Sequence, residues 1–141
     1  MRHPVPHSQL RAGAASAPGT IQAAHYLRRH LAGSGKLPTY LHGHWLAAGL
    51  WQRVGWFDVS ETTLLYLQER LPQLPASSLA WLLNSLRLGG VPAGHALVQS
   101  AATHLVRLQE SDGRWTSEDG PGHYVSTTLA ALHALGWARP R

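Results

Sequence analysis

The 141-residue sequence contains no cysteine, which excludes disulfide bonds and thiolate zinc sites. It has no apolar run near the ~18 residues of a membrane span, and no signal-type apolar segment follows Met1. We therefore expect a soluble, cytoplasmic protein without a membrane partner. No stretch shows the alternation of apolar and polar residues that is typical of strands, which indicates an all-α fold.

Acidic side chains are also scarce, with seven of them against twelve basic ones. All the basic residues except Lys36 are arginines, and they are scattered along the chain rather than gathered on one helix face. This distribution argues against nucleic acid as a partner. It is compatible with an anionic small ligand such as a diphosphate, and equally with an ordinary solvated surface.

Two regions are expected. Residues 1–19 are rich in Pro, Ala, Ser and Gly without an apolar period, which predicts an irregular arm, and residues 20–141 are predicted to form a single helical-repeat domain. Thr20 and Ser60 are the expected N-caps of the first and third helices. Together with the prolines and glycines that flank most of the apolar segments, these caps predict helices over residues 21–31, 39–54, 60–71, 76–89, 92–109 and 121–136.

An internal repeat relates the second and sixth of these helices. The segment HGHWLAAGLWQRVGW (42–56) aligns without a gap on HYVSTTLAALHALGW (123–137), so that His42 falls on His123. The fourth helix fits the same frame. In the sixth helix, Leu129, Leu132 and Leu135 form the predicted inward stripe. One such hairpin cannot bury its apolar face alone, so the hairpins are expected to stack.

The most specific local motif is LVRLQESDGRW (105–115), of the form Leu-x3-Gln-x3-Gly-x-Trp. Gln109 is expected to end a helix, Gly113 to allow a tight reversal, and Trp115 to cover the turn. The segment resembles the QW repeat of squalene–hopene and oxidosqualene cyclases and the related repeat of protein prenyltransferase β subunits. An unrelated helical solenoid with a similar turn is the alternative.

The resemblance implies three helical hairpins that form part of an α/α-toroid, with alternate helices in an outer and an inner ring. Because a closed toroid needs about twice as many hairpins, the protein is expected either to be an open arc or to complete its barrel as a homodimer or with a partner. The family's catalytic residues do not carry over. No Asp-x-Asp-Asp string occurs, the prenyltransferase zinc set lacks its cysteine, and the position of its histidine falls near Tyr124. No cofactor or metal is therefore expected.

The same resemblance places several histidines and aromatic residues where the inner helices begin, at the mouth of a shared cavity. Such a mouth suits a cationic intermediate or an apolar ligand with a polar head. A metal held by His42, His44 and His123 is disfavoured, because residues two apart on a helix point in different directions. The alternative is that these side chains cap helices and cover the surface. The predicted substrate-binding residues are His42, Trp45, Trp81, Tyr124 and Thr127.

Glu118 and Asp119 precede the last helix, just before His123. An acid beside a histidine is a candidate proton-transfer pair, which makes these three residues the predicted catalytic group. Acids at a helix start are also favoured simply by the helix dipole and the free N–H groups.

Two function classes remain open at this point. The first is a small terpene-cyclase-like enzyme or binding protein that acts on an isoprenoid, a polyketide or a similar apolar small molecule. The second is a non-catalytic interaction module whose helical arc docks a partner protein. A cavity rimmed by His42, His123 and Tyr124 would favour the first, and a filled centre with an exposed apolar patch would favour the second.

Overall fold

The computed structural model describes residues 18–140. Within that range the protein is all-helical and has no strand, which confirms the predicted fold class. The elements are α2 (Thr20–Arg29), α3 (Leu41–Arg53), α4 (Phe57–Gln68), η1 (Leu71–Gln73), α5 (Ala76–Gly89), α6 (Ala96–Arg107), η2 (Pro121–His123) and α7 (Tyr124–Ala138). No helix between residues 18 and 140 is both long and apolar enough to cross a lipid bilayer.

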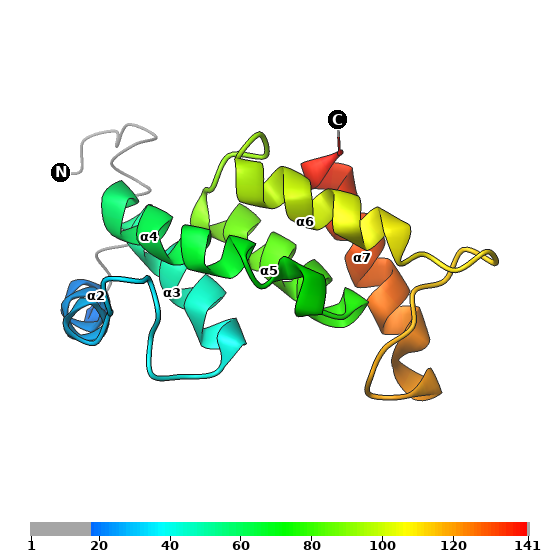
Figure 1. Cartoon of the computed structure of the whole chain (residues 1–141), viewed down its shortest axis with the longest axis horizontal. Coiled ribbons are helices and arrows are strands. Elements are labelled where there is room, and N and C mark those ends of the chain that lie inside the picture. The colour runs from blue at the N-terminus through cyan, green and yellow to red at the C-terminus, as the bar shows by residue number, and fades with distance from the viewer. Residues whose placement is uncertain (1–17, 141) are drawn as a thin grey trace, which may run out of the picture.

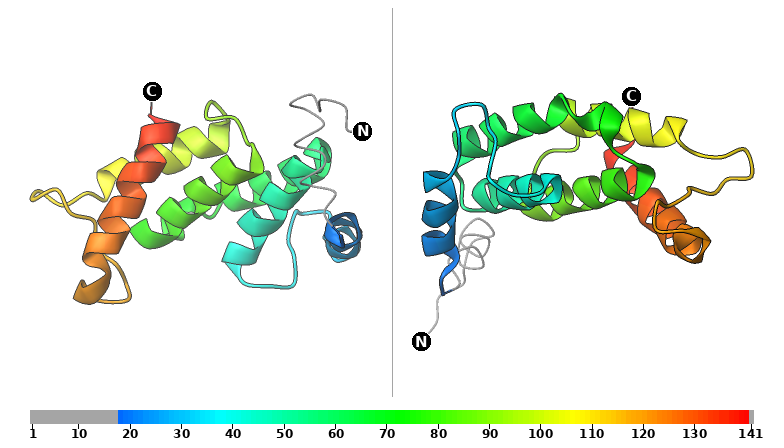
Figure 2. Two further views of the ribbon diagram at one scale, coloured as in Figure 1. Left: turned by 180° about the vertical axis from the view of Figure 1, so that it is seen from behind. Right: turned by 60° about the horizontal axis from the view of Figure 1, so that its bottom comes forward.

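The helices form two layers. Helices α3, α5 and α7 lie side by side in one layer, and α4 and α6 cover them in the other (Figures 1 and 2). Helix α2 packs mainly against α3, at one end of this arrangement, and is seen nearly end-on in Figure 1. The chain thus runs through three hairpins, α2–α3, α4–α5 and α6–α7, as the repeat predicts.

Several helix starts differ from the sequence prediction, among them those of α4, α2 and α6. Ser60 is not an N-cap but lies inside α4, which begins at Phe57, and its buried Oγ donates to the Ala48 carbonyl of α3 at 2.9 Å. Thr20 is the first residue of α2 and Gly19 is its cap. Helix α6 begins at Ala96 rather than near Pro92, because the imidazole Nδ1 of His95 accepts the Leu97 N–H (3.0 Å) and caps it.

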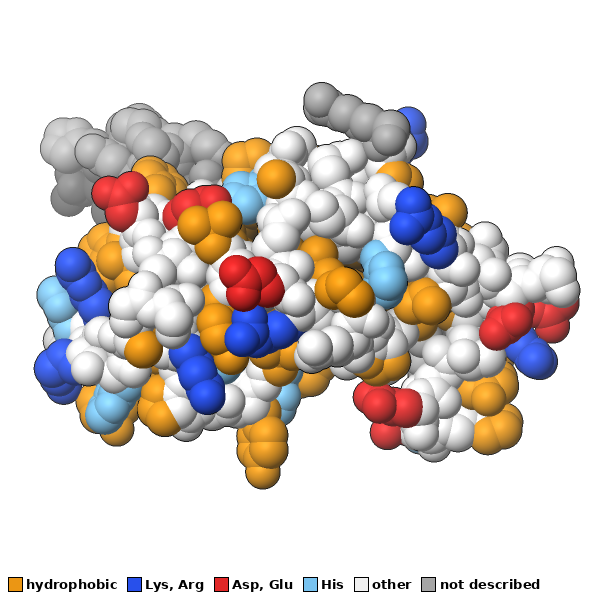
Figure 3. Space-filling view, in the orientation of Figure 1, with side chains coloured by type: hydrophobic (Ala, Val, Ile, Leu, Met, Phe, Trp, Pro, Cys, Tyr) orange, Lys and Arg blue, Asp and Glu red, His pale blue; other side chains and the backbone are white. Residues whose placement is uncertain are grey.

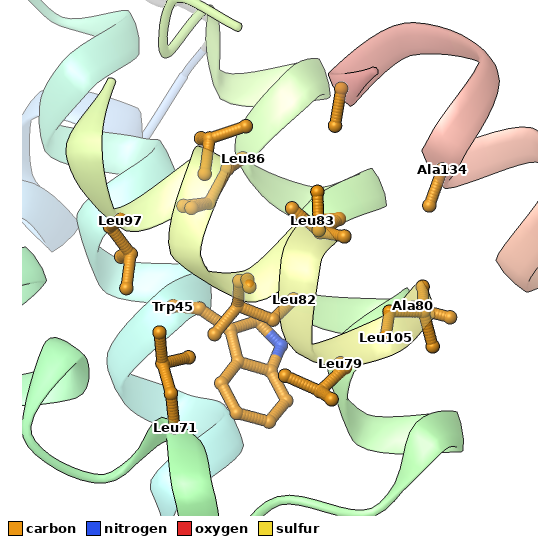
Figure 4. Packing of buried hydrophobic residues seen from close by; sticks show 14 of the residues in the cluster. Trp45, Leu71, Leu79, Ala80, Leu82, Leu83, Leu86, Leu97, Leu105 and Ala134 are labelled. Atoms are coloured by element: carbon orange, nitrogen blue, oxygen red, sulfur yellow. The ribbon is translucent and has the colours of Figure 1, made fainter. Parts of the chain in front are cut away.

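Helix α5 forms the centre of the main hydrophobic core. It starts directly after Pro75 and ends at Gly90, whose φ of 87° is the left-handed conformation that favours glycine at a helix end. Its inward leucines are fully buried, as the periodicity predicts, and pack beneath α6 and against Trp45 of α3 (Figure 4). Burying each such side chain contributes about 1.5–3 kcal/mol. These leucines are Leu79, Leu82, Leu83 and Leu86.

A second, smaller core attaches α2. Ala24, Leu37, Ala47 and Trp51 are buried there, and the Trp51 indole Nε1 donates to the Ala24 carbonyl at 3.1 Å. Ala24 is the buried residue of α2. The first helix is therefore held by a small contact that is separate from the main core.

The predicted inward stripe of α7 is wrong at two of its three positions, and only Leu135 packs against the main core. Leu129 and Leu132 are 63% and 53% exposed, whereas Ala131 and Ala134 are fully buried against the rest of the fold. The helix is apolar on every side, so its periodicity did not define one inward face. The small alanines face inward, and the larger leucines at these two positions face out.

The turn after α6 has the roles that the motif predicts. The side-chain amide of Gln109 donates to the Gly113 carbonyl at 2.9 Å, across the reversal. Trp115 is 1% exposed, and its Nε1 donates to the Leu105 carbonyl near the end of α6 at 2.8 Å. Its backbone N–H donates to Thr128 Oγ1 of α7 (2.9 Å), so this turn joins the last two helices.

Candidate functional site

Three of the predicted binding residues meet where α3 and α5 begin. The His42 ring stacks on Trp81 of α5, with centroids 4.9 Å apart and 19° between the planes. The Trp45 and Trp81 rings meet edge to face, with their centroids 5.4 Å apart. The Tyr40 ring stacks on His42, with centroids 5.8 Å apart. We call Tyr40, His42, Trp45 and Trp81 the aromatic cluster. It offers flat π faces that suit apolar or cationic groups.

The members of the cluster differ in burial. Trp45 is 1% exposed and belongs to the core, whereas Trp81 is 45% and Tyr40 79% exposed. The Trp45 Nε1 has no hydrogen-bond partner among the described residues. Only the outer rings of the cluster are therefore available to a ligand at the surface.

His44 has a structural position. It is buried, its Nε2 accepts the Leu37 N–H at 2.9 Å, and its Nδ1 donates to the Tyr40 carbonyl at 3.0 Å. Burial lowers the pKa of His44 below its usual 6.5, and the nearby charges of Arg70 and Lys36 act in the same direction. Both ring nitrogens are occupied in the neutral form. Across residues 18–140, no three His, Asp or Glu side chains are grouped so as to hold a metal.

The predicted proton-transfer group is not assembled. Glu118, Asp119 and His123 are all exposed, and neither carboxylate forms a hydrogen bond or ion pair with the imidazole in the described chain. Asp119 uses its backbone N–H to reach Ser117 Oγ at 3.2 Å. Both acids precede η2, and neither η2 nor α7 has an acidic residue in its first turn, so the structure does not place them as helix-dipole partners either.

The remaining two predicted residues lie away from the aromatic cluster. Thr127 is buried against the core with 6% exposure. Tyr124 lies under the Arg114 guanidinium, 5.4 Å from the ring centroid, and both line a hollow of about 500 Å³ between the turn and α7. The predicted binding residues therefore do not line one cavity mouth. His42, Trp45 and Trp81 lie together between α3 and α5, and Tyr124 lies apart from them beside Arg114.

The hollow that sequence reasoning missed lies between α2 and α3. It has a volume of about 370 Å³ and mostly apolar walls, and we call it the α2–α3 hollow. The sequence prediction began the second helix at Thr39, whereas α3 begins at Leu41 and residues 37–39 form a wall of the hollow. The lining residues are Tyr26, Leu27, His30, Leu37, Pro38, Thr39, Gly43, Leu46 and Ala47.

A groove adjoins this hollow on the face away from α4 and α6. It has a volume of about 180 Å³ and runs between α3 and α5, and we call it the inner-face groove. Leu46 lines both the hollow and the groove, so the two are neighbours across one side chain. At the far end Arg53 donates to the Leu88 carbonyl at 3.4 Å. The lining residues are Leu46, Gly49, Leu50, Arg53, Ser85, Leu88 and Gly89.

Comparison of the chain with models of protein families, with curated protein sequences and with solved structures returns no match. The relation to cyclases and prenyltransferases therefore stays a prediction from the motif in residues 105–137.

Proposed function

We propose that this chain binds an elongated apolar molecule of the isoprenoid or acyl-chain kind, in the α2–α3 hollow and along the inner-face groove. The observation that carries the proposal is the hollow itself. Its volume of about 370 Å³ falls within the range of small-molecule sites, roughly 300–1,000 Å³, and its walls are mostly apolar with a few polar groups.

The chemistry of the walls defines the ligand. Leu27, Leu37 and Leu46 remove apolar surface from water, which contributes about 0.8 kcal/mol for each buried methylene of a ligand. A compact polar molecule would gain little from such walls. His30 and Thr39 are the polar groups on the rim, where they can bond water or a ligand oxygen.

The groove extends the site and selects the head group. A chain that lies in the hollow and crosses Leu46 reaches Arg53 at the far end of the groove. The exposed guanidinium has five N–H donors and gives only one of them to the Leu88 carbonyl, so it can also bind a carboxylate or a phosphate. The proposed ligand therefore has an apolar tail and an anionic head.

No reaction is included in this proposal, because Glu118, Asp119 and His123 lie exposed and unconnected in the structure. A second candidate function, docking of a protein chain, is favoured by the exposed leucines of α7, Leu129 and Leu132.

The test is calorimetric titration of the full chain with laurate and with dodecanol. We expect Leu46→Arg to weaken both ligands at least about tenfold, since it places a charge between the hollow and the groove. Leu65→Arg is the matched control, because Leu65 is 58% exposed on α4, against 48% for Leu46, and lies outside both cavities. Arg53→Gln should weaken laurate only. Equal binding by the Leu46 and Leu65 variants, or no binding by the unmodified chain, would reject the proposal.

A further inference from the structure

Helix α7 carries an unpartnered apolar face. Its sequence, YVSTTLAALHALGWA, contains no acidic or basic residue other than one histidine. The inward side is buried, while the opposite side exposes Val125 (73%), Leu129 (63%) and Leu132 (53%). A helix that is hydrophobic all round is normally covered on all sides. Val125 and Leu129 line the open hollow beside the turn at Asp112–Arg114, and within residues 18–140 all three side chains stay more than half exposed.

The exposed residues form one straight stripe. Val125, Leu129, Leu132 and Gly136 follow at intervals of four, three and four, which keeps them on one face of the helix. We call them the α7 outer stripe. Gly136 is exposed, and a Cβ there would meet nothing within 4 Å. The stripe therefore consists of three protruding side chains, followed by a gap at Gly136.

The opposite end of the molecule does not offer a matching surface. There α2 lies against α3 and covers the apolar residues of the smaller core, among them Trp51 and Ala47. Stacking of α7 onto the α3 end of another copy would require α2 to leave. A contact of the α7 outer stripe with itself requires no such displacement.

We propose that a second copy of this chain covers the α7 outer stripe, with the two α7 helices antiparallel about a two-fold axis. In an antiparallel pair of identical helices, the residue numbers of any two facing positions add up to the same total. The stripe satisfies this condition, because Leu129 faces Leu132 of the partner subunit while Val125 faces Gly136 of the partner subunit. The side chain of Val125 then enters the open space at the glycine, as ridges enter grooves between packed helices.

The charges at the two ends of α7 fit the same arrangement. Glu118 and Asp119 lie exposed just before the helix, and Arg139 lies exposed just after it. Figure 3 shows acidic side chains gathered at the end of the molecule where α7 begins. Arg114 at that end is paired with Asp112 at 3.6 Å. An antiparallel pair brings the acidic end of one helix beside Arg139 of the partner subunit, whereas a parallel pair would bring like charges together.

The first experiment measures mass by sedimentation equilibrium at micromolar concentration. We expect the unmodified chain to have twice its 15.4 kDa monomer mass. Leu132→Glu should raise the dissociation constant at least about a hundredfold, because symmetry places two new like charges in the interface. Leu65→Glu on α4 is the control and should stay dimeric. Both leucines are more than half exposed, so both variants should keep the helical circular dichroism of the unmodified chain. A monomeric unmodified chain, or a Leu132 variant that stays dimeric, would overturn the proposal.

The second experiment tests the antiparallel register, and the absence of cysteine from the chain makes it free of background. Chains with Leu129→Cys are mixed with chains with Leu132→Cys and oxidised. We expect the mixture to form the disulfide-linked dimer at least about fivefold faster than either variant alone, because only facing positions come within the ~7 Å that a disulfide spans between Cα atoms. Equal or faster cross-linking of each variant with itself would exclude this register.

Discussion

At the scale of single residues, the histidines illustrate how position decides chemistry. His42 lies in the aromatic cluster at the surface, whereas His44, two residues later, points to the other side and holds the chain before α3. It bonds Leu37 and Tyr40 at once, and its ring also stacks on Tyr66 with centroids 5.0 Å apart. A protonated ring would carry a proton on the nitrogen that accepts the Leu37 N–H. The neutral form is therefore the one that the fold uses.

This arrangement predicts an acid-sensitive contribution to stability. The pKa of His44 is lowered by burial in the folded state, so the unfolded chain takes up the proton at a higher pH than the folded chain does. The contribution of His44 is fully present above the unfolded pKa of about 6.5 and is lost as the pH falls below it, toward the lower folded pKa. Urea unfolding from pH 7.5 down to pH 5 should show this loss.

The control for the pH experiment is His44→Gln, because glutamine does not titrate and can still accept or donate a hydrogen bond. We expect the variant to be less stable than the unmodified chain at pH 7.5 and to lose less stability on acidification. Parallel pH profiles for the two proteins would show that His44 does not cause the dependence.

At the scale of the elements, the contact between α3 and α5 is set by very different residues at its two ends. Near the C-terminal ends the backbones touch, since a Cβ on Gly89 would lie 2.6 Å from the Gly49 Cα. Near the N-terminal ends the stacked rings of His42 and Trp81 fill the space between the helices. The two helices thus have glycines where their backbones touch, near the C-terminal ends, and aromatic rings between them nearer the N-terminal ends.

Gly89→Ala is accordingly expected to destabilise the protein by about 1–3 kcal/mol, the usual cost of overpacking. The clash is with backbone atoms of Gly49, which cannot rotate away, and it exceeds the gain of up to ~1 kcal/mol from better helix propensity. Chemical denaturation measures the change. Gly33→Ala is the matched control, since a Cβ there meets nothing within 4 Å, and it should lie within ~0.5 kcal/mol of the unmodified chain. Equal stability of the two variants would contradict the close contact.

The sequence predicts the elements better than the surfaces they expose. Proline, glycine and cap residues located the six α-helices within residues 18–140, because these residues act locally on the backbone. The start of α4 was misplaced because the Ser60 side chain bonds a distant group, the Ala48 carbonyl, instead of capping its own helix. The outward face of α7 was missed, because this helix has no lysine, arginine or acidic residue and its apolar residues occur on every side, so that no side is marked as outward.

The candidate site was predictable only in part. The sequence grouped His42, Trp45 and Trp81 at the starts of neighbouring helices, and the structure brings their rings together, although His42 and Trp81 are not equivalent positions of the repeat. It did not separate Tyr124 from that cluster, and it gave no sign of the α2–α3 hollow. The hollow depends on the path of residues 37–39, for which the sequence has no regular period. The angle at which α2 meets α3 is likewise a tertiary feature rather than a local one.

At the scale of the whole molecule, the fold consists of two unequal cores. The main core joins α3 through α7, and the smaller one holds α2 through Ala24 and the Trp51 hydrogen bond. Because the α2–α3 hollow is bounded by α2, any movement of that helix changes the proposed ligand site. We therefore expect the stability of α2 and binding at the proposed site to be coupled.

The two cores predict that α2 opens separately from the rest. Native-state hydrogen exchange of the full chain should show faster exchange for α2 amides than for α5 amides, whose side chains form the fully buried centre. Leu82→Ala should weaken the main core by at least ~2 kcal/mol and so accelerate α5 exchange about thirtyfold or more. The same change should leave α2 exchange unaltered, since the main core is intact in the state where α2 alone has opened. Saturating laurate should slow α2 exchange in both proteins, because the ligand binds between α2 and α3. If α2 and α5 amides accelerate together in Leu82→Ala, the helix does not open on its own and the two cores act as one cooperative unit.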